Sequence, residues 1–212
     1  MAARFLDAAA RAGFKHAIET IENASAVEVV VAVRRRSAAY HHANAIVGAV
    51  VAFAALAAML FASSPFGLNS ILFDPFAVGV IAAALVELTP QVKRALTRRV
   101  SRTAHVLRAA RATFVERGIH ATTGRSGVLV YVSWLERTIA LVPDRGLAAS
   151  WPAAAIDAAE RALTDAMARG GAEVARVLEA LAPELARAMP HRDDDVNELP
   201  DAIDSDLDGA AR

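Results

Sequence analysis

An acidic residue that directly follows a β-strand is the first candidate for chemistry in this chain. Asp144 comes after the apolar run 137–143 and begins the tripeptide Asp-Arg-Gly. Strand ends that face a loop are places where proteins often carry reactive groups. A carboxylate there could bind a metal ion or take part in phosphoryl transfer. Alternatively, it is a turn residue that accepts hydrogen bonds from its own backbone, as Asp commonly does in Gly-containing turns.

The loop 121–127, ATTGRSG, supplies the neighbours that we expect for Asp144. It enters the following strand at the end of the sheet where Asp144 lies. Its hydroxyl and guanidinium side chains could hold a phosphate, although the spacing is not that of a P-loop. The predicted rim of an anion or metal site is therefore Asp144, Arg125, Thr122 and Thr123, with the metal left open. An Asp144–Arg125 ion pair is the structural alternative.

Glu136 is a weaker candidate, because it lies in the turn between two predicted strands. A β-hairpin places its turn and the outer end of its second strand at opposite ends. At about 3.3 Å per residue, Glu136 and Asp144 should lie about 20 Å apart, too far to share one metal ion. A solvated turn pair of Glu136 with Arg137 is the simpler interpretation.

The remaining side chains form no recognised catalytic pattern. The chain has no cysteine, which excludes disulfides, thiolate metal sites and cysteine nucleophiles. Its histidines form neither H-x-x-x-H nor HExxH, and no serine lies in G-x-S-x-G. The acidic run 193–195 and the acids after it could bind a divalent cation such as calcium loosely. They lack the order of an EF-hand, so a solvated tail is the favoured interpretation.

Composition limits the class of protein. The 212 residues include 23 Lys and Arg against 23 Asp and Glu, so the formal net charge is zero. General nucleic-acid binding, which needs a basic excess, is therefore not expected. The hydrophobic content of 55% is high for a soluble protein with 22% charged residues. The apolar residues must be concentrated in one region of the chain.

Two apolar runs predict a membrane hairpin. Residues 45–62 carry no charge and span about 27 Å as a helix, close to the thickness of a bilayer core. Residues 71–88 form a second run, which Asp74, Pro75 and Glu87 interrupt near its ends. A domain of this size has no room to bury two such helices on all sides. We therefore expect the lipid bilayer as a partner.

The charges flanking these runs predict the orientation. Arginines 34–36 precede the first run, Lys93 and several arginines follow the second, and the loop 62–75 contains no Lys or Arg. The positive-inside rule then places both termini in the cytoplasm and the short loop outside. The basic residues are expected to lie near lipid head groups.

The rest of the sequence predicts an α/β domain. Residues 26–33 form a strand whose near-continuous hydrophobicity indicates burial on both faces, and the strands 127–133 and 137–143 form an antiparallel hairpin. We expect one sheet to contain Val29, Val31, Leu129, Tyr131, Ile139 and Leu141. The predicted helices are 1–23, 90–118, 152–168 and 172–189, with a turn at 144–146. The chain is expected to divide into a first domain segment (residues 1–43), a transmembrane hairpin (residues 44–90), a second domain segment (residues 91–190) and a disordered acidic tail (residues 191–212).

Two stretches resemble a known family. IETIENASAVEVVVAVRRRSAAY is similar to the opening of the TPM domain, named after its thylakoid-lumen, photosystem-associated and receptor-modulator members. FVERGIHATTGRSGVLVYVSWLERTIALVPDRGL, followed by Trp151, resembles the rest of that domain, including its "GVL-x-Y-x-S" strand, "ER" hairpin and "D-x-G" turn. The resemblance covers roughly 1–43 and 105–190. It implies a small mixed sheet flanked by helices, interrupted here by the hairpin, in a bacterial inner-membrane member of the family.

Two functions follow from this resemblance. The TPM family is linked to the repair of membrane complexes, which implies a non-enzymatic module that binds or helps assemble other membrane proteins. A chloroplast member has acid phosphatase activity and some members bind calcium, so a metal-assisted phosphatase is the alternative. Because the sequence contains no recognised catalytic arrangement, we favour the interaction module.

Overall fold

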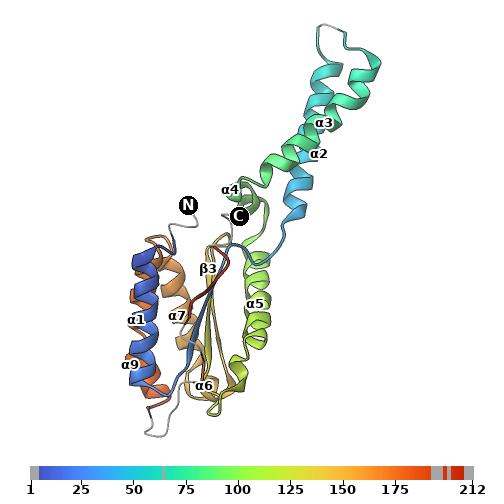
Figure 1. The fold of residues 1–212 in the computed structure, drawn as a ribbon. Coiled ribbons are helices and arrows are strands. Elements are labelled where there is room, and N and C mark those ends of the chain that lie inside the picture. Colours follow the sequence, from blue (N-terminus) through green and yellow to red (C-terminus); the bar gives the residue numbers. More distant parts are fainter. Residues whose placement is uncertain (1–4, 64, 192–197, 200–201, 208–212) are drawn as a thin grey trace. The chain divides into compact units, whose positions relative to one another are not determined.

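The computed structural model describes residues 5–63, 65–191, 198–199 and 202–207. The chain divides into two compact units, and each is described by itself (Figure 1). One unit, here called the α/β unit, contains residues 1–37 and 103–212. The other, the hairpin unit, contains residues 38–102. The hairpin unit is thus an insertion in the sequence of the α/β unit.

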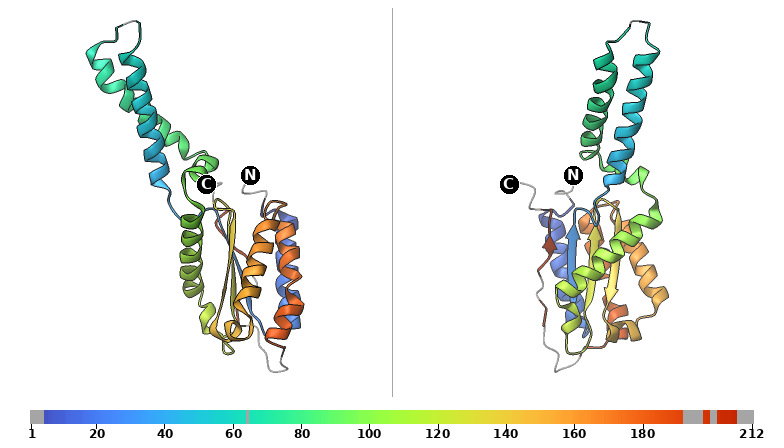
Figure 2. Two further views of the ribbon diagram at one scale, coloured as in Figure 1. Left: turned by 180° about the vertical axis from the view of Figure 1, so that it is seen from behind. Right: turned by 90° about the vertical axis from the view of Figure 1, so that its right-hand side faces the viewer.

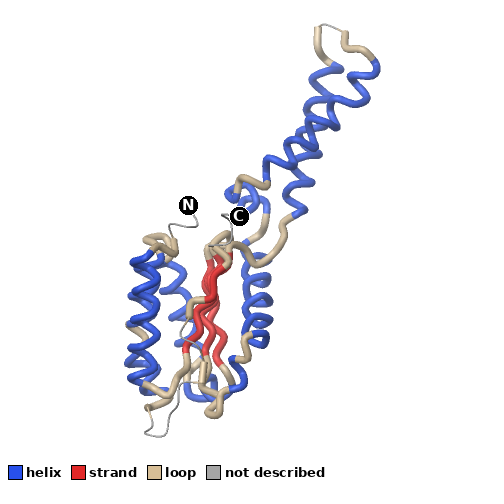
Figure 3. Tube along the Cα trace, viewed as in Figure 1, coloured by secondary structure: helices blue, strands red, loops and turns tan. Residues whose placement is uncertain are grey.

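A mixed four-stranded sheet forms the centre of the α/β unit (Figure 3). Strand β1 pairs in parallel with β2 and β4, whereas β2 and β3 form an antiparallel hairpin. The spatial order is β3-β2-β1-β4, with β1 (Val29–Arg34), β2 (Val128–Ser133), β3 (Thr138–Pro143) and β4 (Asp204–Ser205). The predicted α/β class is confirmed. So is the shared sheet of Val29, Val31, Leu129, Tyr131, Ile139 and Leu141.

Helices cover both faces of the sheet (Figures 1 and 2). One face packs against α1 (Ala8–Ala24), α7 (Ala153–Ala166), α8 (Gly171–Glu179) and α9 (Ala182–Ala188). The other face packs against α5 (Arg99–Glu116), which crosses the strands diagonally in the right-hand view of Figure 2. Val31 of β1 contributes to the first core and Val30 to the second. The predicted burial of this strand on both faces is therefore confirmed.

Three predicted elements differ from the structure. The expected helix 90–118 is divided into α4 (Pro90–Leu96) and α5, because Thr97 between them is extended and its hydroxyl lies 3.0 Å from His42 Nε2. The expected helix 172–189 is divided into α8 and α9. Pro183 lies in the first turn of α9, and its ring cannot continue a preceding helix. The expected turn 144–146 is instead the start of a short helix, α6 (Arg145–Ser150), with Asp144 as its N-cap.

Side chains of α7 close the outer edge of β3. The Thr164 hydroxyl accepts the N–H of Ile139 at 3.0 Å, and the Glu160 carboxylate accepts the N–H of Leu141 at 2.7 Å. Burial raises the pKa of Glu160 above its ordinary value, although the Leu141 hydrogen bond partly opposes this. At the opposite edge, β4 pairs with two residues of β1, so this edge of the sheet is partly covered.

The acidic tail is ordered where it meets this sheet. Residues 204–205 form β4, and Leu207 is buried in the core. The prediction of a disordered tail over 191–212 is wrong for residues 202–207. The reason is local: apolar Ile203 and Leu207 alternate with acidic residues, so one side of this segment can be buried. The acidic run 193–195 lies outside the described residues.

The hairpin unit contains α2 (His41–Leu60) and α3 (Leu68–Val86), whose backbones approach closely at two glycines. A Cβ on Gly79 would lie 2.7 Å from the Gly48 carbonyl oxygen, and one on Gly48 would lie 2.9 Å from the Gly79 carbonyl oxygen. Each glycine is followed four residues later by alanine, Ala52 and Ala83. Small residues at this spacing let membrane helices pack at short distance.

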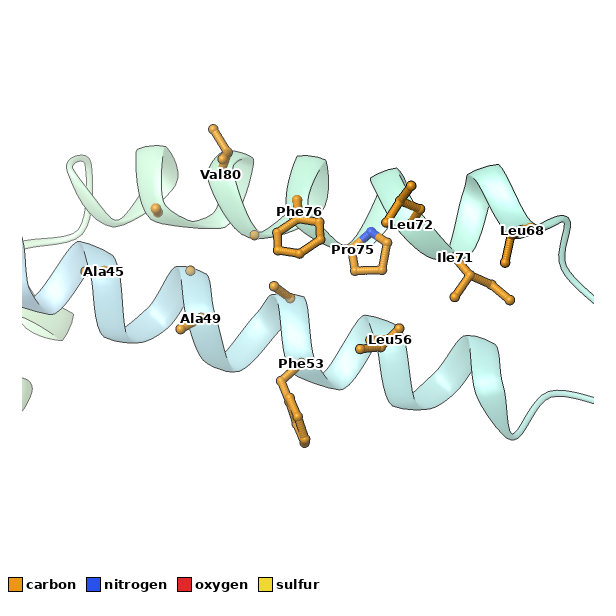
Figure 4. Close-up of a pocket in the computed structure, with 14 residues that line it drawn as sticks. Ala45, Ala49, Phe53, Leu56, Leu68, Ile71, Leu72, Pro75, Phe76 and Val80 are labelled. Carbon is orange, nitrogen blue, oxygen red and sulfur yellow. The ribbon is translucent and has the colours of Figure 1, made fainter.

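Both helices are long and apolar enough to cross a membrane. Their mean hydropathies are 2.2 and 1.8, and only 11% and 17% of an 18-residue apolar stretch in each helix is buried. Phe53 is 75% exposed and points away from α3 in Figure 4. Between the helices lies an apolar groove of about 790 Å³, where Leu56, Ile71 and Pro75 face the gap (Figure 4). Helices in a soluble core would bury these side chains.

Candidate functional site

Asp144 joins the end of β3 to the start of α6. It is 5% exposed and is the N-cap residue of α6, where its Oδ1 accepts the N–H of Arg145, the first helical residue, at 2.7 Å. Its Oδ2 atom is also buried, yet it accepts no hydrogen bond from any described residue. A buried acceptor without a donor typically costs about 1–3 kcal/mol. An external donor at this oxygen would remove that cost.

A pocket of about 850 Å³ opens beside Asp144. Its charged lining comes from four separate segments: α5, the 3₁₀ turn η1 (Ile119–Ala121), the loop after it, and the β3–α6 junction. The lining residues are Arg111, Phe114, His120, Arg125, Pro143, Asp144, Arg145 and Ala148. Three guanidinium groups therefore share the pocket with one carboxylate, which favours a ligand with negative charge.

Gly146 brings the predicted loop against α6. A Cβ at this position would lie 2.6 Å from the carbonyl oxygen of Gly124 and 2.7 Å from that of Arg125. The N–H of Leu147 also donates to the Arg125 carbonyl oxygen at 3.2 Å. The glycine of the Asp-Arg-Gly motif thus permits the close approach that places Asp144 and Arg125 around one pocket.

Arg125 lines this pocket without pairing to Asp144. Its guanidinium donates to the main-chain oxygen of His120, and its backbone is left-handed, with φ of 51°. Among the residues that the structure describes, no ion pair joins Arg125 to Asp144. The two residues are brought together as predicted, but the alternative of a direct ion pair between them is not seen.

The two predicted threonines have other contacts. The Thr122 hydroxyl accepts the N–H of Ser126 at 3.1 Å, within its own loop. The N–H of Thr123 donates to the Glu198 carboxylate at 3.1 Å. Neither residue lines the pocket. Their place is taken by Arg111, His120 and Arg145, which the sequence reasoning missed. Arg111 lies one turn before Phe114 on α5, and this spacing was the only sequence signal for it.

Glu136 lies at the opposite end of the β2–β3 ladder from Asp144. The register pairs Ser133 with Thr138 near Glu136, and Val128 with Pro143 near Asp144. The Glu136 carboxylate is buried. It accepts the N–H of Ser37 at 3.0 Å and the hydroxyl of Ser133 at 2.5 Å. It is therefore a member of a polar network rather than the exposed turn pair that the sequence suggested.

Tyr131 extends that network. Its hydroxyl accepts from the Ser37 hydroxyl at 3.3 Å, and burial raises the pKa of Tyr131 above its ordinary value. Because Ser37 is the last residue before the chain enters the hairpin unit, the network fixes the backbone where the chain leaves the α/β unit. The polar groups of this network are hydrogen-bonded to one another, and we assign the network a structural role.

The described residues do not form a metal centre. Within the described ranges, no group of three or more His, Cys, Asp or Glu side chains is placed to hold a metal ion. At the pocket, the single carboxylate of Asp144 is accompanied by three arginines. This donor set suits an anion and opposes a divalent cation such as calcium.

The comparisons with known proteins add a fold and no function. No protein-family model matches the chain, and the search of curated proteins finds no match. The structure is similar to the NMR structure of BA42 protein from the psychrophilic bacterium Bizionia argentinensis sp. nov.. The two chains are 17% identical, the TM-score is 0.57, and the match covers 95% of each chain. At this identity the likeness supports a shared fold alone.

Proposed function

We propose that this chain is a two-span integral protein of a bacterial inner membrane, with both termini in the cytoplasm. The exposed apolar surfaces of α2 and α3 support the membrane insertion. The arginines before α2 and after α3, with none in the connecting loop, support the orientation.

Cysteine labelling tests this topology, because the native chain contains no cysteine. Ser63→Cys lies in the loop between α2 and α3 and is exposed, while Ser150→Cys is an exposed control in the α/β unit. In intact spheroplasts, a membrane-impermeant maleimide should label Ser63→Cys and should reach Ser150→Cys only after permeabilisation. The reverse pattern would invert the topology, and equal access at both sites would exclude a spanning hairpin.

We further propose that the α/β unit is a TPM-like interaction module that binds or helps assemble membrane protein complexes. The observation that carries this proposal is the placement of an exposed apolar hairpin inside the sequence of a folded α/β unit. Such an insertion would tether the unit to the bilayer through two connections, next to integral membrane partners. Crosslinking in native membranes, followed by capture of the tagged full chain, should recover the same membrane proteins repeatedly. Reciprocal capture from the partner is the control.

The three arginines that line the Asp144 pocket support a second proposed function, phosphomonoester hydrolysis. A hydrogen phosphate group matches both kinds of lining: its P–OH could donate to the unpartnered Asp144 Oδ2, while its charged oxygens accept from the guanidinium groups. The purified full chain should then hydrolyse p-nitrophenyl phosphate, and Asp144→Asn should abolish this. Asp157→Asn, an exposed carboxylate on α7, is the matched control. No hydrolysis by the wild-type protein would exclude the enzyme and leave an anion-binding pocket.

A further inference from the structure

The C-terminal segment 202–207 lies along the edge of β1 as a bound peptide would. It pairs in parallel through Ala32 with Asp204 and Val33 with Ser205, and the N–H of Asp206 donates to the Val33 oxygen at 3.2 Å. The right-hand view of Figure 2 shows β4 beside β1 at the edge of the sheet. Only two of the six residues of β1 are paired with β4, so the ladder at this edge is short.

Acidic side chains on one side of this segment meet basic groups of the α/β unit. The Asp204 carboxylate pairs with the guanidinium groups of both Arg34 and Arg117, and Arg34 also donates to the Asp204 main-chain oxygen at 2.9 Å. The side chains of Arg34 and Asp204 are only 19% and 18% exposed. Asp206 Oδ1 accepts the N–H of Arg35 at 2.6 Å. Charge-assisted contacts of this kind are stronger than neutral ones.

Apolar side chains on the other side enter the core. Leu207 is 3% exposed, and Ile203 packs against the same cluster as Val33. The segment Ile203-Asp204-Ser205-Asp206-Leu207 therefore presents acidic residues to one side and apolar residues to the other, the period of a strand. Each side has a complementary surface at β1.

A second contact lies before this segment. The carboxylate of Glu28, just before β1, accepts the N–H groups of Glu198 and Leu199, both at 3.1 Å. Segment 202–207 is thus held by side-chain contacts to its backbone, ion pairs and apolar contacts with the core, and by a β-ladder of only two residue pairs. A strand that paired with all six residues of β1 would form a longer ladder than the two paired residues of β4 do.

We propose that the edge of β1 is a peptide-binding site for a partner protein, and that the chain's own segment 202–207 occupies it until the partner displaces it. The partner supplies an extended segment in which two acidic residues alternate with apolar ones. Binding takes place by addition of a strand to the sheet. This inference rests on the proposed interaction function and names its recognition surface.

A full-length variant with a weakened internal segment tests the proposal. Asp204→Lys with Leu207→Asp removes the ion pairs and the apolar anchor together, and Ala202→Lys, at an exposed position of the same segment, is the matched control. The probe is a fluorescein-labelled peptide with the sequence of residues 198–207, followed by fluorescence anisotropy. Loss of the internal competitor should tighten peptide binding by at least about tenfold relative to wild type. Ala202→Lys should resemble wild type.

Specificity is tested on the same variant. Adding Arg34→Gln should lower the affinity for the peptide by about tenfold, because the ion pair with the aspartate equivalent to Asp204 is lost. A scrambled peptide of equal charge should bind poorly. No gain over wild type, or equal binding of the scrambled peptide, would overturn the proposal. Concentration-dependent dimerisation without tighter peptide binding would indicate that two copies of the chain exchange their segments 202–207 at this edge. That result would also overturn the proposal.

If the double variant fails to fold, hydrogen exchange on the wild-type chain replaces the binding measurement. Excess peptide should displace the chain's own segment 202–207 from the edge of β1. The amides of Asp206 and Leu207 in that segment should then exchange faster. Unchanged protection at saturating peptide would contradict the proposal. A failed capture experiment with wild-type membranes would instead contradict the interaction function itself, so the two failures are distinguishable.

Discussion

Gly146 packs its Cα against the carbonyl oxygen of Gly124, closely enough that an added Cβ would lie 2.6 Å from it. This contact links the start of α6 to the loop that carries Arg125. The pocket beside Asp144 depends on this contact, because Asp144 and Arg125 belong to two separate segments of the sequence.

Gly146→Ala should destabilise the α/β unit and open the pocket. The new methyl group must push the loop 124–125 away, and overpacking of this kind typically costs about 1–3 kcal/mol. Urea unfolding followed by circular dichroism measures the change. Gly124→Ala is the control in the same contact. Its Cβ would meet only Ser126 Oγ at 3.5 Å and Ser126 Cβ at 3.8 Å, so stability should be nearly unchanged. Equal losses in both variants would contradict the assigned role of Gly146.

Asp144→Asn should change the pH dependence of phosphate binding. In the wild-type pocket the unpartnered Oδ2 needs a donor, so the hydrogen phosphate monoanion is preferred and binding should weaken as the pH rises above about 6, the second pKa of a phosphate ester. An asparagine amide can donate to the dianion, so this preference should disappear. Isothermal titration calorimetry with methyl phosphate, a monoester whose dianion has no P–OH group, between about pH 5 and about pH 8 measures the effect.

His120 is the control for that experiment, because it is another titratable group lining the pocket. His120→Gln should keep the preference for the monoanion if Asp144 causes it. If His120→Gln removes the preference and Asp144→Asn retains it, the assignment to Asp144 is wrong.

The sheet was predictable from sequence because its three main strands are β-branched runs with short connections. The run 29–33 shows the continuous hydrophobicity of a strand buried on both faces, and only a short turn separates β2 from β3. Strand β4 was not predicted. Its alternation, Ile203 to Leu207, is short and lies within acidic sequence, so its burial depends on the edge of β1, which local patterns do not encode.

The candidate site was predicted incompletely for a similar reason. Asp144 and Arg125 are marked by Gly-containing loops, and hairpin geometry brings both to the same end of the sheet. α5 crosses the sheet diagonally (Figure 2), and Arg111 on α5 and His120 on the following turn η1 line the pocket. That crossing depends on tertiary packing of Val106, Ala110 and Phe114, and residue spacing does not specify it.

Glu160→Gln should stabilise the α/β unit increasingly as the pH rises. Burial raises the pKa of Glu160, so the folded state holds this proton more tightly than the unfolded state. The stability contributed by the protonated Glu160 is fully present below the pKa of the unfolded state, about 4.3. It is lost as the pH rises through the pKa of Glu160 in the folded state. Glutamine keeps an oxygen for the Leu141 N–H and carries no charge. The difference in free energy of unfolding between variant and wild type should therefore grow from about pH 4 to about pH 7.

Chemical unfolding of both proteins at several pH values measures that difference. Glu116→Gln, an exposed glutamate at the end of α5, is the control, and its difference from wild type should not follow the same trend. A difference for Glu160→Gln that falls with rising pH would show that the ionised carboxylate stabilises the edge of β3.

Gly79→Leu should separate the two helices of the hairpin unit. The position has no space for a side chain, because a Cβ alone would lie 2.7 Å from the Gly48 carbonyl oxygen and 2.8 Å from the Ala52 Cβ. In a bilayer or micelle the helices gain little from hydrophobic burial, so close backbone packing at small residues contributes much of their association. Loss of this contact should lower the thermal stability of the hairpin in detergent. Val80→Leu, at the next position and 70% exposed, changes the size of an exposed side chain, and it should melt like wild type. Thermal melts of the full chain by circular dichroism in one detergent compare the three proteins. Coincident melts for Gly79→Leu and wild type would show that α2 and α3 do not depend on the glycine contact for their association.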